Sequence, residues 1–155
     1  MIEVTISAAD AIGHLRALPQ DLAARLADTV VRLAQTLYDR VEENLSGAVL
    51  QRRSGRLAAS IVQQVDGLSA SVGFDPAAVP YGAAQEFGAD IRAHLIAAKN
   101  ARALSFVVAG KRVFAKRVWF PGAHLPERSF LRSALADLAP EIGAEIAAGV
   151  AETVE

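Results

Sequence analysis

The residues of this chain best suited to chemistry are a group of cations and aromatic side chains between positions 111 and 120. The group consists of Lys111, Arg112, Lys116 and Arg117 with the aromatic residues Trp119 and Phe120. Cations neutralise phosphate charge and aromatic rings stack on bases, so this combination is typical of a nucleic-acid surface. The same side chains also suit an arm that binds another protein, or a solvated hairpin. These three interpretations all remain open from the residues alone.

No pattern for nucleophilic or metal chemistry accompanies this group. Neither Ser54 nor Ser60 lies in the Gly-x-Ser-x-Gly turn that exposes a catalytic serine. The pair Gly110-Lys111 lacks the rest of a phosphate-binding loop and reads as a tight turn. The histidines are scattered and have no cysteine partners at metal-ligand spacing: His14, His94 and His124. We therefore predict a protein that is not an enzyme and that holds no cofactor or metal.

The length and composition predict one globular domain over residues 1–155. A chain of 155 residues, 52% of them hydrophobic, can bury a self-sufficient core. It has no cysteine, so disulfides and thiolate chemistry are excluded. No apolar run approaches the roughly 18 residues that a membrane span needs. The first residues lack a basic segment followed by an apolar one, so we expect synthesis in the cytoplasm and no membrane partner.

The hydrophobic pattern divides the first third of the chain into a strand and two helices. Alternation over residues 2–6 predicts a short strand. Ser7 and Asp10 then suit the start of a short helix, which ends near Pro19. Its apolar stripe is Ile12, Leu15 and Leu18. A long helix follows, because apolar residues recur at spacings of three and four: Leu22, Leu26, Val30, Leu33, Leu37, Val41 and Leu45.

The remainder reads as two hairpins, a short helical segment and a C-terminal helix. The first hairpin turns at Asp66-Gly67, and residues 81–86 form one or two helical turns that end at Gly88. The second hairpin covers about 103–120 and turns at Gly110-Lys111. The last helix starts near Phe130 and continues past Pro140. We therefore predict an α+β fold, in which a small antiparallel sheet of hairpins packs against a long N-terminal helix and a C-terminal helix.

Basic side chains occur on both sides of the second hairpin. With a period of two, Arg112 and Lys116 share one side, and Lys111 and Arg117 share the other. A sheet packed flat on a core would keep charges on one side only. The hairpin is therefore predicted to project from the domain as a basic ribbon.

Charge is unevenly distributed between two neighbouring segments. Residues 91–132 contain nine basic side chains and one acid, whereas residues 133–155 contain five acids and no base. These segments could attract each other within one chain. They could equally meet across neighbouring subunits, where complementary charge sets orientation and partner choice.

Three separated signatures carry the strongest resemblance to a known family. They are Ser54-Gly55-Arg56-Leu57-Ala58-Ala59-Ser60-Ile61, Tyr81-Gly82-Ala83-Ala84-Gln85-Glu86-Phe87-Gly88 and Pro126-Glu127-Arg128-Ser129-Phe130-Leu131-Arg132-Ser133-Ala134-Leu135. In this order and spacing they resemble the tailed-phage head-tail joining family, also called tail-completion or neck proteins. The departures are Ser54 where threonine is common and Ser129 where proline is common. Their apolar members are predicted to be core residues: Leu57, Ile61, Tyr81, Phe87, Phe130 and Leu131.

The resemblance implies a structural virion protein of a phage, a prophage or a phage-derived gene-transfer particle. Its two main helices would cover one face of an antiparallel sheet. Copies would form a ring, hexameric by this resemblance, that completes the tail or joins it to the head. The partners implied are connector, stopper or tail-tube proteins, and DNA passing through the lumen.

The basic side chains of the signatures, of the loop before the first signature and of the second hairpin are our candidate contacts to other subunits or neck partners, together with one tryptophan. They are Arg52, Arg53, Arg56, Lys111, Arg112, Lys116, Arg117, Trp119, Arg128 and Arg132. The arginines of the first and third signatures could instead form simple ion pairs on helix faces. The alternative function is a small nucleic-acid-binding module that uses the basic hairpin.

Overall fold

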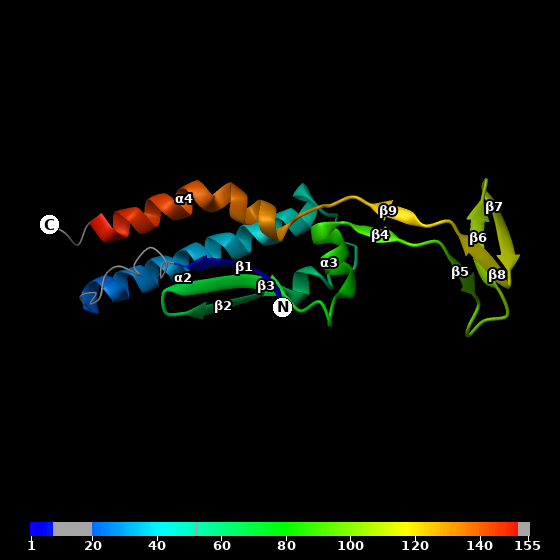
Figure 1. The fold of residues 1–155 in the computed structure, drawn as a ribbon, viewed down its shortest axis with the longest axis horizontal. Helices are drawn as coiled ribbons and strands as arrows, with labels where there is room; N and C mark the ends of the chain where they lie inside the picture. Colours follow the sequence, from blue (N-terminus) through cyan, green and yellow to red (C-terminus); the bar gives the residue numbers. More distant parts are fainter. Residues whose placement is uncertain (8–19, 52, 152–155) are drawn as a thin grey trace.

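A computed structural model of the chain describes residues 1–7, 20–51 and 53–151. The short helix predicted after Ser7, with its stripe of Ile12, Leu15 and Leu18, lies outside the described residues, as does Arg52. The described part consists of an elongated helix-and-sheet body and a narrow arm that leaves one end of it (Figure 1). The α+β fold is as predicted.

The sheet of the body has three antiparallel strands. They are β1 (Ile2–Ser7), β2 (Val62–Asp66) and β3 (Ser69–Phe74), in the order β1-β3-β2. The tight turn between β2 and β3 includes Gly67, whose φ of 55° favours glycine. The predicted first strand and first hairpin are therefore confirmed.

Two long helices cover this sheet. The first, α2 (Gln20–Glu43), packs on the sheet, and α4 (Leu131–Ala151) lies along α2 (Figure 1). A π-helical turn, Asn44–Ala48, extends α2, and the chain leaves it through Gly47 at a φ of 138°. All seven residues of the predicted apolar stripe are buried: Leu22, Leu26, Val30, Leu33, Leu37, Val41 and Leu45. Pro140 lies inside α4, which continues through it.

No helix in the described ranges combines the length and the apolar character that are needed to cross a bilayer.

A short helix, α3 (Pro80–Phe87), packs beside a 3₁₀ turn, Ala58–Ser60. The contact depends on Gly82, because a Cβ at that position would meet the ring of Phe74 and would lie 3.1 Å from Leu57. The first and second signatures therefore touch each other at Leu57 and Gly82.

Three successive strand pairs form the arm, which we define as residues 89–125. At its root β4 (Ala89–Ile91) pairs with β9 (Ala123–Leu125). Next, β5 (His94–Ala97) pairs with β8 (Arg117–Phe120). At the tip β6 (Leu104–Val108) pairs with β7 (Lys111–Ala115). The arm extends away from the end of the body that carries α3 (Figure 1).

The predicted hairpin of about 103–120 was therefore only part of the projecting unit. Its return strand ends at Ala115, and the chain bends at Lys116 before continuing as β8. There β8 pairs with β5 and not with β6. At the bend, the amide of Ala98 donates a hydrogen bond of 3.1 Å to the carbonyl of Lys116. The sequence pattern does not predict a strand at 94–97, and β5 is the partner that divides the predicted hairpin.

The prediction of a core position is wrong for two residues. Tyr81 and Phe87 are 42% and 52% exposed, although the other four apolar signature residues are buried. The reason is that α3 has only two turns and turns Gly82 and Glu86 inward, which leaves the other positions toward solvent.

Candidate functional site

A buried carboxylate links the second signature to the third. The Glu86 side chain is fully buried at the end of α3. It accepts hydrogen bonds from the amides of Phe130, Leu131 and Arg132 at 2.8, 3.0 and 3.1 Å. The hydroxyl of Ser129 donates another at 2.7 Å. Because the first amides of a helix have no partner within the helix, Glu86 acts as the N-terminal cap of α4 from a distant part of the chain.

Arg132 completes this arrangement, which we call the Glu86 cluster. Its Nε donates to the Glu86 carboxylate at 3.1 Å, and its Nη2 donates to the Glu86 carbonyl at 2.7 Å. Nη2 also bonds the carboxylate of Glu127 at 2.8 Å. The guanidinium carbon lies 4.7 Å from the centre of the exposed Phe87 ring, a cation–π distance. Of the candidate contact residues, Arg132 is thus a structural residue that holds α3 against α4.

The surroundings of Glu86 set its ionisation. Burial of the carboxyl raises its pKa. The hydrogen bonds from Leu131, Ser129, Arg132 and Phe130 lower it, and together they outweigh burial, so the pKa of Glu86 lies below its ordinary value. Glu86 is therefore ionised in the folded protein at neutral pH.

The Glu86 cluster also anchors the root of the arm. The two arm strands begin and end next to it, and the amide of Arg128 donates a hydrogen bond of 2.8 Å to the Gln85 carbonyl. Gly88 has a φ of 73°, and a Cβ there would lie 2.9 Å from the carbonyl oxygen of Leu125. This close approach requires glycine. The direction in which the arm leaves the body is therefore determined by tightly packed groups.

The three signatures meet in space around α3, although they are separated in the chain. No family model matches this chain, and no similar curated protein or solved structure is found. The Leu57–Gly82 contact joins the first signature to the second, and the Glu86 cluster joins the second to the third. Their spacing along the chain therefore has a structural explanation in this protein.

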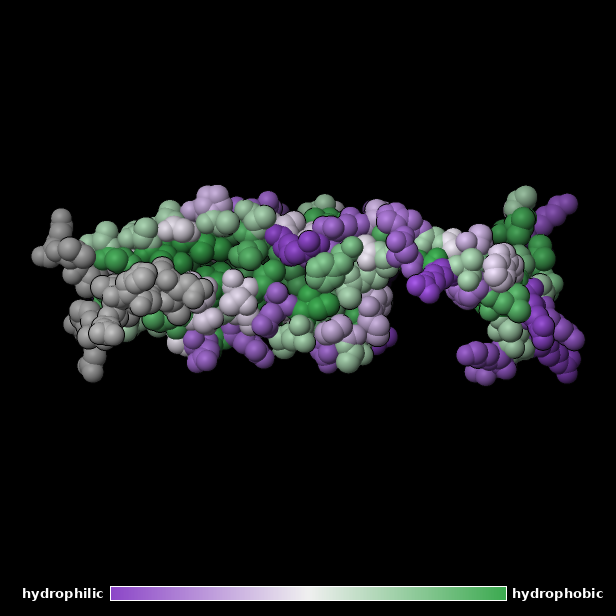
Figure 2. Space-filling view, in the orientation of Figure 1, coloured by the Kyte–Doolittle hydropathy of each residue, from purple (hydrophilic) through white to green (hydrophobic). Residues whose placement is uncertain are grey.

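The arm differs from the body in having no buried residue at all between 89 and 125. It carries seven lysines and arginines and a single acid, Asp90. Its exposed large apolar side chains are Ile91, Leu95, Ile96, Val107, Val108, Val113, Phe114 and Trp119. Apolar and strongly polar groups alternate over its surface in Figure 2. Exposed apolar side chains interspersed with charge are typical of a protein interaction site.

Two positions on the arm concentrate aromatic and basic side chains. Trp119 is 63% exposed and lies opposite Leu95 of the paired strand. Arg117, two residues before Trp119, lies on the same face of β8. Nearer the tip, Phe114 is 65% exposed and shares a face with Arg112. The structure thus places five of the candidate contact residues together on the exposed arm: Lys111, Arg112, Lys116, Arg117 and Trp119.

The remaining candidates lie on the body. Arg53, Arg56 and Arg128 are exposed, and none of them forms an ion pair in the described part of the chain. Arg53 and Arg128 face a common pocket beside α3. Arg56 does not line this pocket. The described candidate contact residues therefore lie on the arm, in the Glu86 cluster, at the pocket and, for Arg56, elsewhere on the surface of the body.

The acidic residues of α4 do not meet the basic arm within one chain. Glu145 pairs with Arg32 of α2 at 2.8 Å, and α4 runs away from the arm (Figure 1). Asp137 and Glu141 are exposed, and neither pairs with a described cation. No arm lysine or arginine forms an ion pair within the described residues. The acidic and basic segments could have met within one chain or between neighbouring subunits. For the described acids of α4, contact within one chain is excluded.

Glu86 belongs to the second signature, but the sequence pattern predicts no role for it. Its partners lie 43 to 46 positions further along the chain. A local pattern cannot reveal such a cap, because ordinary caps come from residues adjacent to the helix. The sequence feature that could have pointed to this cap is that Glu86 is the single acid among the mostly apolar and small residues of the second signature.

Proposed function

We propose that this chain is a structural assembly protein of a tailed phage, a prophage or a gene-transfer particle. Copies join into a ring at the head-tail neck, where the ring completes the tail or joins it to the head. The observation that carries this proposal is the basic, partly apolar arm, which contains no buried residue. The resemblance of the three signatures to head-tail joining proteins supports the same function.

The arm needs a partner for physical reasons. A two-stranded ribbon is marginally stable in water unless another surface covers it. Three such ribbons in series, with Trp119 and Phe114 exposed, leave their apolar groups uncovered in a single chain. A contact between an arm and the next subunit buries this surface. Because arm and body are different surfaces, their contact is heterologous and closes into a ring when the rotation permits.

Charge favours another copy of the chain as one partner. The arm is basic, and Asp137 and Glu141 lie on the exposed side of α4 without an ion-pair partner in the part of the chain that the structure describes. An arm that reaches the α4 of a neighbouring copy brings these opposite charges together. Connector, stopper and tail-tube proteins are the other partners of such a ring, which would reside in the virion around the DNA path.

A nucleic-acid-binding module is the second candidate function. It is favoured by the exposed Trp119 and Phe114 beside cations, because stacking and phosphate contacts both require such groups. A salt titration with duplex DNA separates the two functions. A DNA-binding module loses affinity steeply with salt, whereas a ring protein alone binds DNA weakly.

Removing the arm tests the proposal most directly. Ile91 and Ala123 are antiparallel partners, so an Asn-Gly turn can join them in place of residues 92–122. We expect the melting temperature to change by less than about 5 °C, because the deleted residues contribute no core. Ring assembly by the purified protein, seen by sedimentation and negative-stain electron microscopy, should disappear. If rings persist without residues 92–122, the arm does not carry assembly.

Reversing the arm charges tests its electrostatics separately. Replacing Lys111, Arg112, Lys116 and Arg117 with glutamate should shift the free energy of unfolding by less than about 1 kcal/mol, because exposed charges add little stability. Assembly of tailed particles in cells that carry this variant should be impaired. The control exchanges lysine for arginine and arginine for lysine at the same four positions, and should assemble. Normal particles from the glutamate variant would count against a docking role for these charges.

A further inference from the structure

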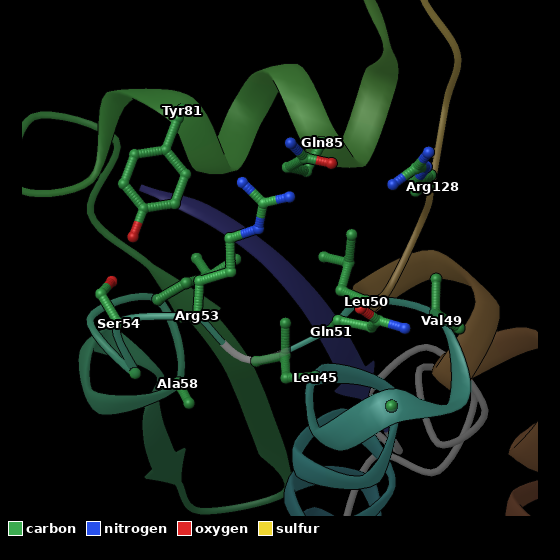
Figure 3. Close-up of a pocket in the computed structure, with 13 residues that line it drawn as sticks. Leu45, Val49, Leu50, Gln51, Arg53, Ser54, Ala58, Tyr81, Gln85 and Arg128 are labelled. Carbon is green, nitrogen blue, oxygen red and sulfur yellow. The ribbon is translucent and has the colours of Figure 1, made fainter. Parts of the chain in front are cut away.

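A pocket on the body lies where the three signatures meet. It has a volume of about 790 Å³ and lies between α3, the π-helical turn after α2 and the segments 49–51 and 53–58 (Figure 3). Its apolar floor includes Leu45, Leu50 and Leu57. A pocket with an apolar floor and a few polar groups at its edge is the usual form of a binding site.

Two of the polar groups at this edge are cationic, and neither has an ion-pair partner among the described residues. Arg53 rises from the loop and directs its guanidinium into the space between Tyr81 and Gln85, with Arg128 on the far side of Gln85 (Figure 3). Neither guanidinium forms an ion pair, and no described residue that lines the pocket is acidic. The Tyr81 hydroxyl and the Gln85 side-chain amide also form no hydrogen bond within the described ranges. Four groups thus have unused hydrogen-bonding capacity toward one pocket.

We propose that this pocket binds an acidic peptide segment of another protein. Carboxylates of the segment pair with Arg53 and Arg128, since guanidinium binds carboxylate through two parallel hydrogen bonds. An aliphatic side chain between them covers the floor at Leu50. Tyr81 and Gln85 bind the peptide backbone. The arm of another copy is excluded as the occupant, because its charge has the same sign as the pocket.

The apolar floor favours a peptide over nucleic acid. A phosphate backbone would satisfy Arg53 and Arg128 but would leave Leu45, Leu50 and Leu57 without an apolar partner. Alternating acidic and aliphatic residues satisfy both requirements. This inference goes beyond the role of the arm, and it holds whether or not the arm forms a ring.

The test uses the full chain and a fluorescein-labelled, end-capped hexapeptide of alternating glutamate and leucine. We expect saturable binding by fluorescence anisotropy, and binding weaker by about tenfold or more when glutamine replaces every glutamate. Arg53→Glu combined with Arg128→Glu should also weaken binding by about tenfold or more. The matched control is Arg92→Glu with Arg102→Glu, which changes the charge equally on the arm and should alter affinity by less than about twofold.

Single Arg53→Ala and Arg128→Ala variants guard against misfolding of the double variant. Both positions are exposed, so each single variant should remain folded and weaken binding by about threefold or more. The proposal is overturned if the glutamine peptide binds equally well, if the arm variant loses as much affinity, or if no binding occurs at millimolar protein. It is also overturned if a short DNA duplex binds with the same dependence on Arg53 and Arg128. None of these outcomes affects the arm-deletion result, so the two proposals fail independently.

Discussion

Glu86→Ala should lower the free energy of unfolding by about 3 to 5 kcal/mol. The substitution removes the acceptor of the buried amides of Phe130 and Leu131, and each unsatisfied amide costs about 1 to 3 kcal/mol. It also removes the buried partner of Arg132. Urea unfolding followed by circular dichroism measures the loss. The helix signal of the folded protein should also fall, because the start of α4 loses its cap.

The matched control for this prediction is Glu127→Gln. Glu127 bonds the same Arg132 side chain at 2.8 Å, but it is exposed, so its removal should cost less than about 1 kcal/mol. A loss at Glu127 as large as the loss at Glu86 would show that the ion pairs with Arg132, and not the buried cap, stabilise the fold.

The pH dependence of stability supplies a second readout for Glu86. Its pKa is lower in the folded than in the unfolded protein, so its ionised form contributes stability that is fully present above its ordinary value of about 4.5. This contribution should decline as the pH falls below that value toward the lowered pKa. In Glu86→Gln the decline should be smaller than in the unmodified protein. Identical pH profiles would contradict the role assigned to the Glu86 carboxylate.

Leu33→Asp should unfold the protein. Leu33 is 2% exposed in the middle of α2, where the helix packs on the sheet, and an ionised carboxylate there has no partner. We expect a loss of more than about 4 kcal/mol, which is comparable to the whole stability of many domains. Circular dichroism and limited proteolysis should show an unfolded chain.

Val31→Asp is the matched control for Leu33→Asp. Val31 lies on the same helix but is 49% exposed, so the same residue introduced there should change stability by less than about 0.5 kcal/mol. Valine and aspartate also have similar helix propensities. A well-folded Leu33→Asp variant, or equal losses at both positions, would show that α2 buries a different face.

The body of the fold could be predicted because its signals are local. The spacing of Leu26, Val30 and Leu33 along α2 reflects the period of a helix, and the whole stripe is buried as expected. The turn at Asp66-Gly67 marks the hairpin of β2 and β3 in the same way. Hydrophobic periodicity and turn residues report on neighbours in the chain, so these elements needed no knowledge of tertiary contacts.

The arm could be predicted only in part. Alternation and the Gly110 turn identified its tip, which is a local hairpin. The pairing of Leu95 with Trp119 brings together residues that the sequence pattern did not connect, so the extent of the arm was underestimated. Tyr81 and Phe87 were predicted to be buried but are exposed. A two-turn helix has too few positions for its sequence to show which face is buried.

The amino-acid sequence by itself determined the long helix α2, the C-terminal helix α4, the first hairpin, the excess of positive charge in the arm and the absence of cysteine chemistry. Each of these depends on composition or on residues a few positions apart. Only the tertiary structure decided that Glu86 caps α4, that Arg132 is structural, and that Arg53 and Arg128 face one pocket. Those arrangements depend on distances between groups far apart in the chain, which become short only when α3 packs against Phe74 at the end of β3 and against the start of α4.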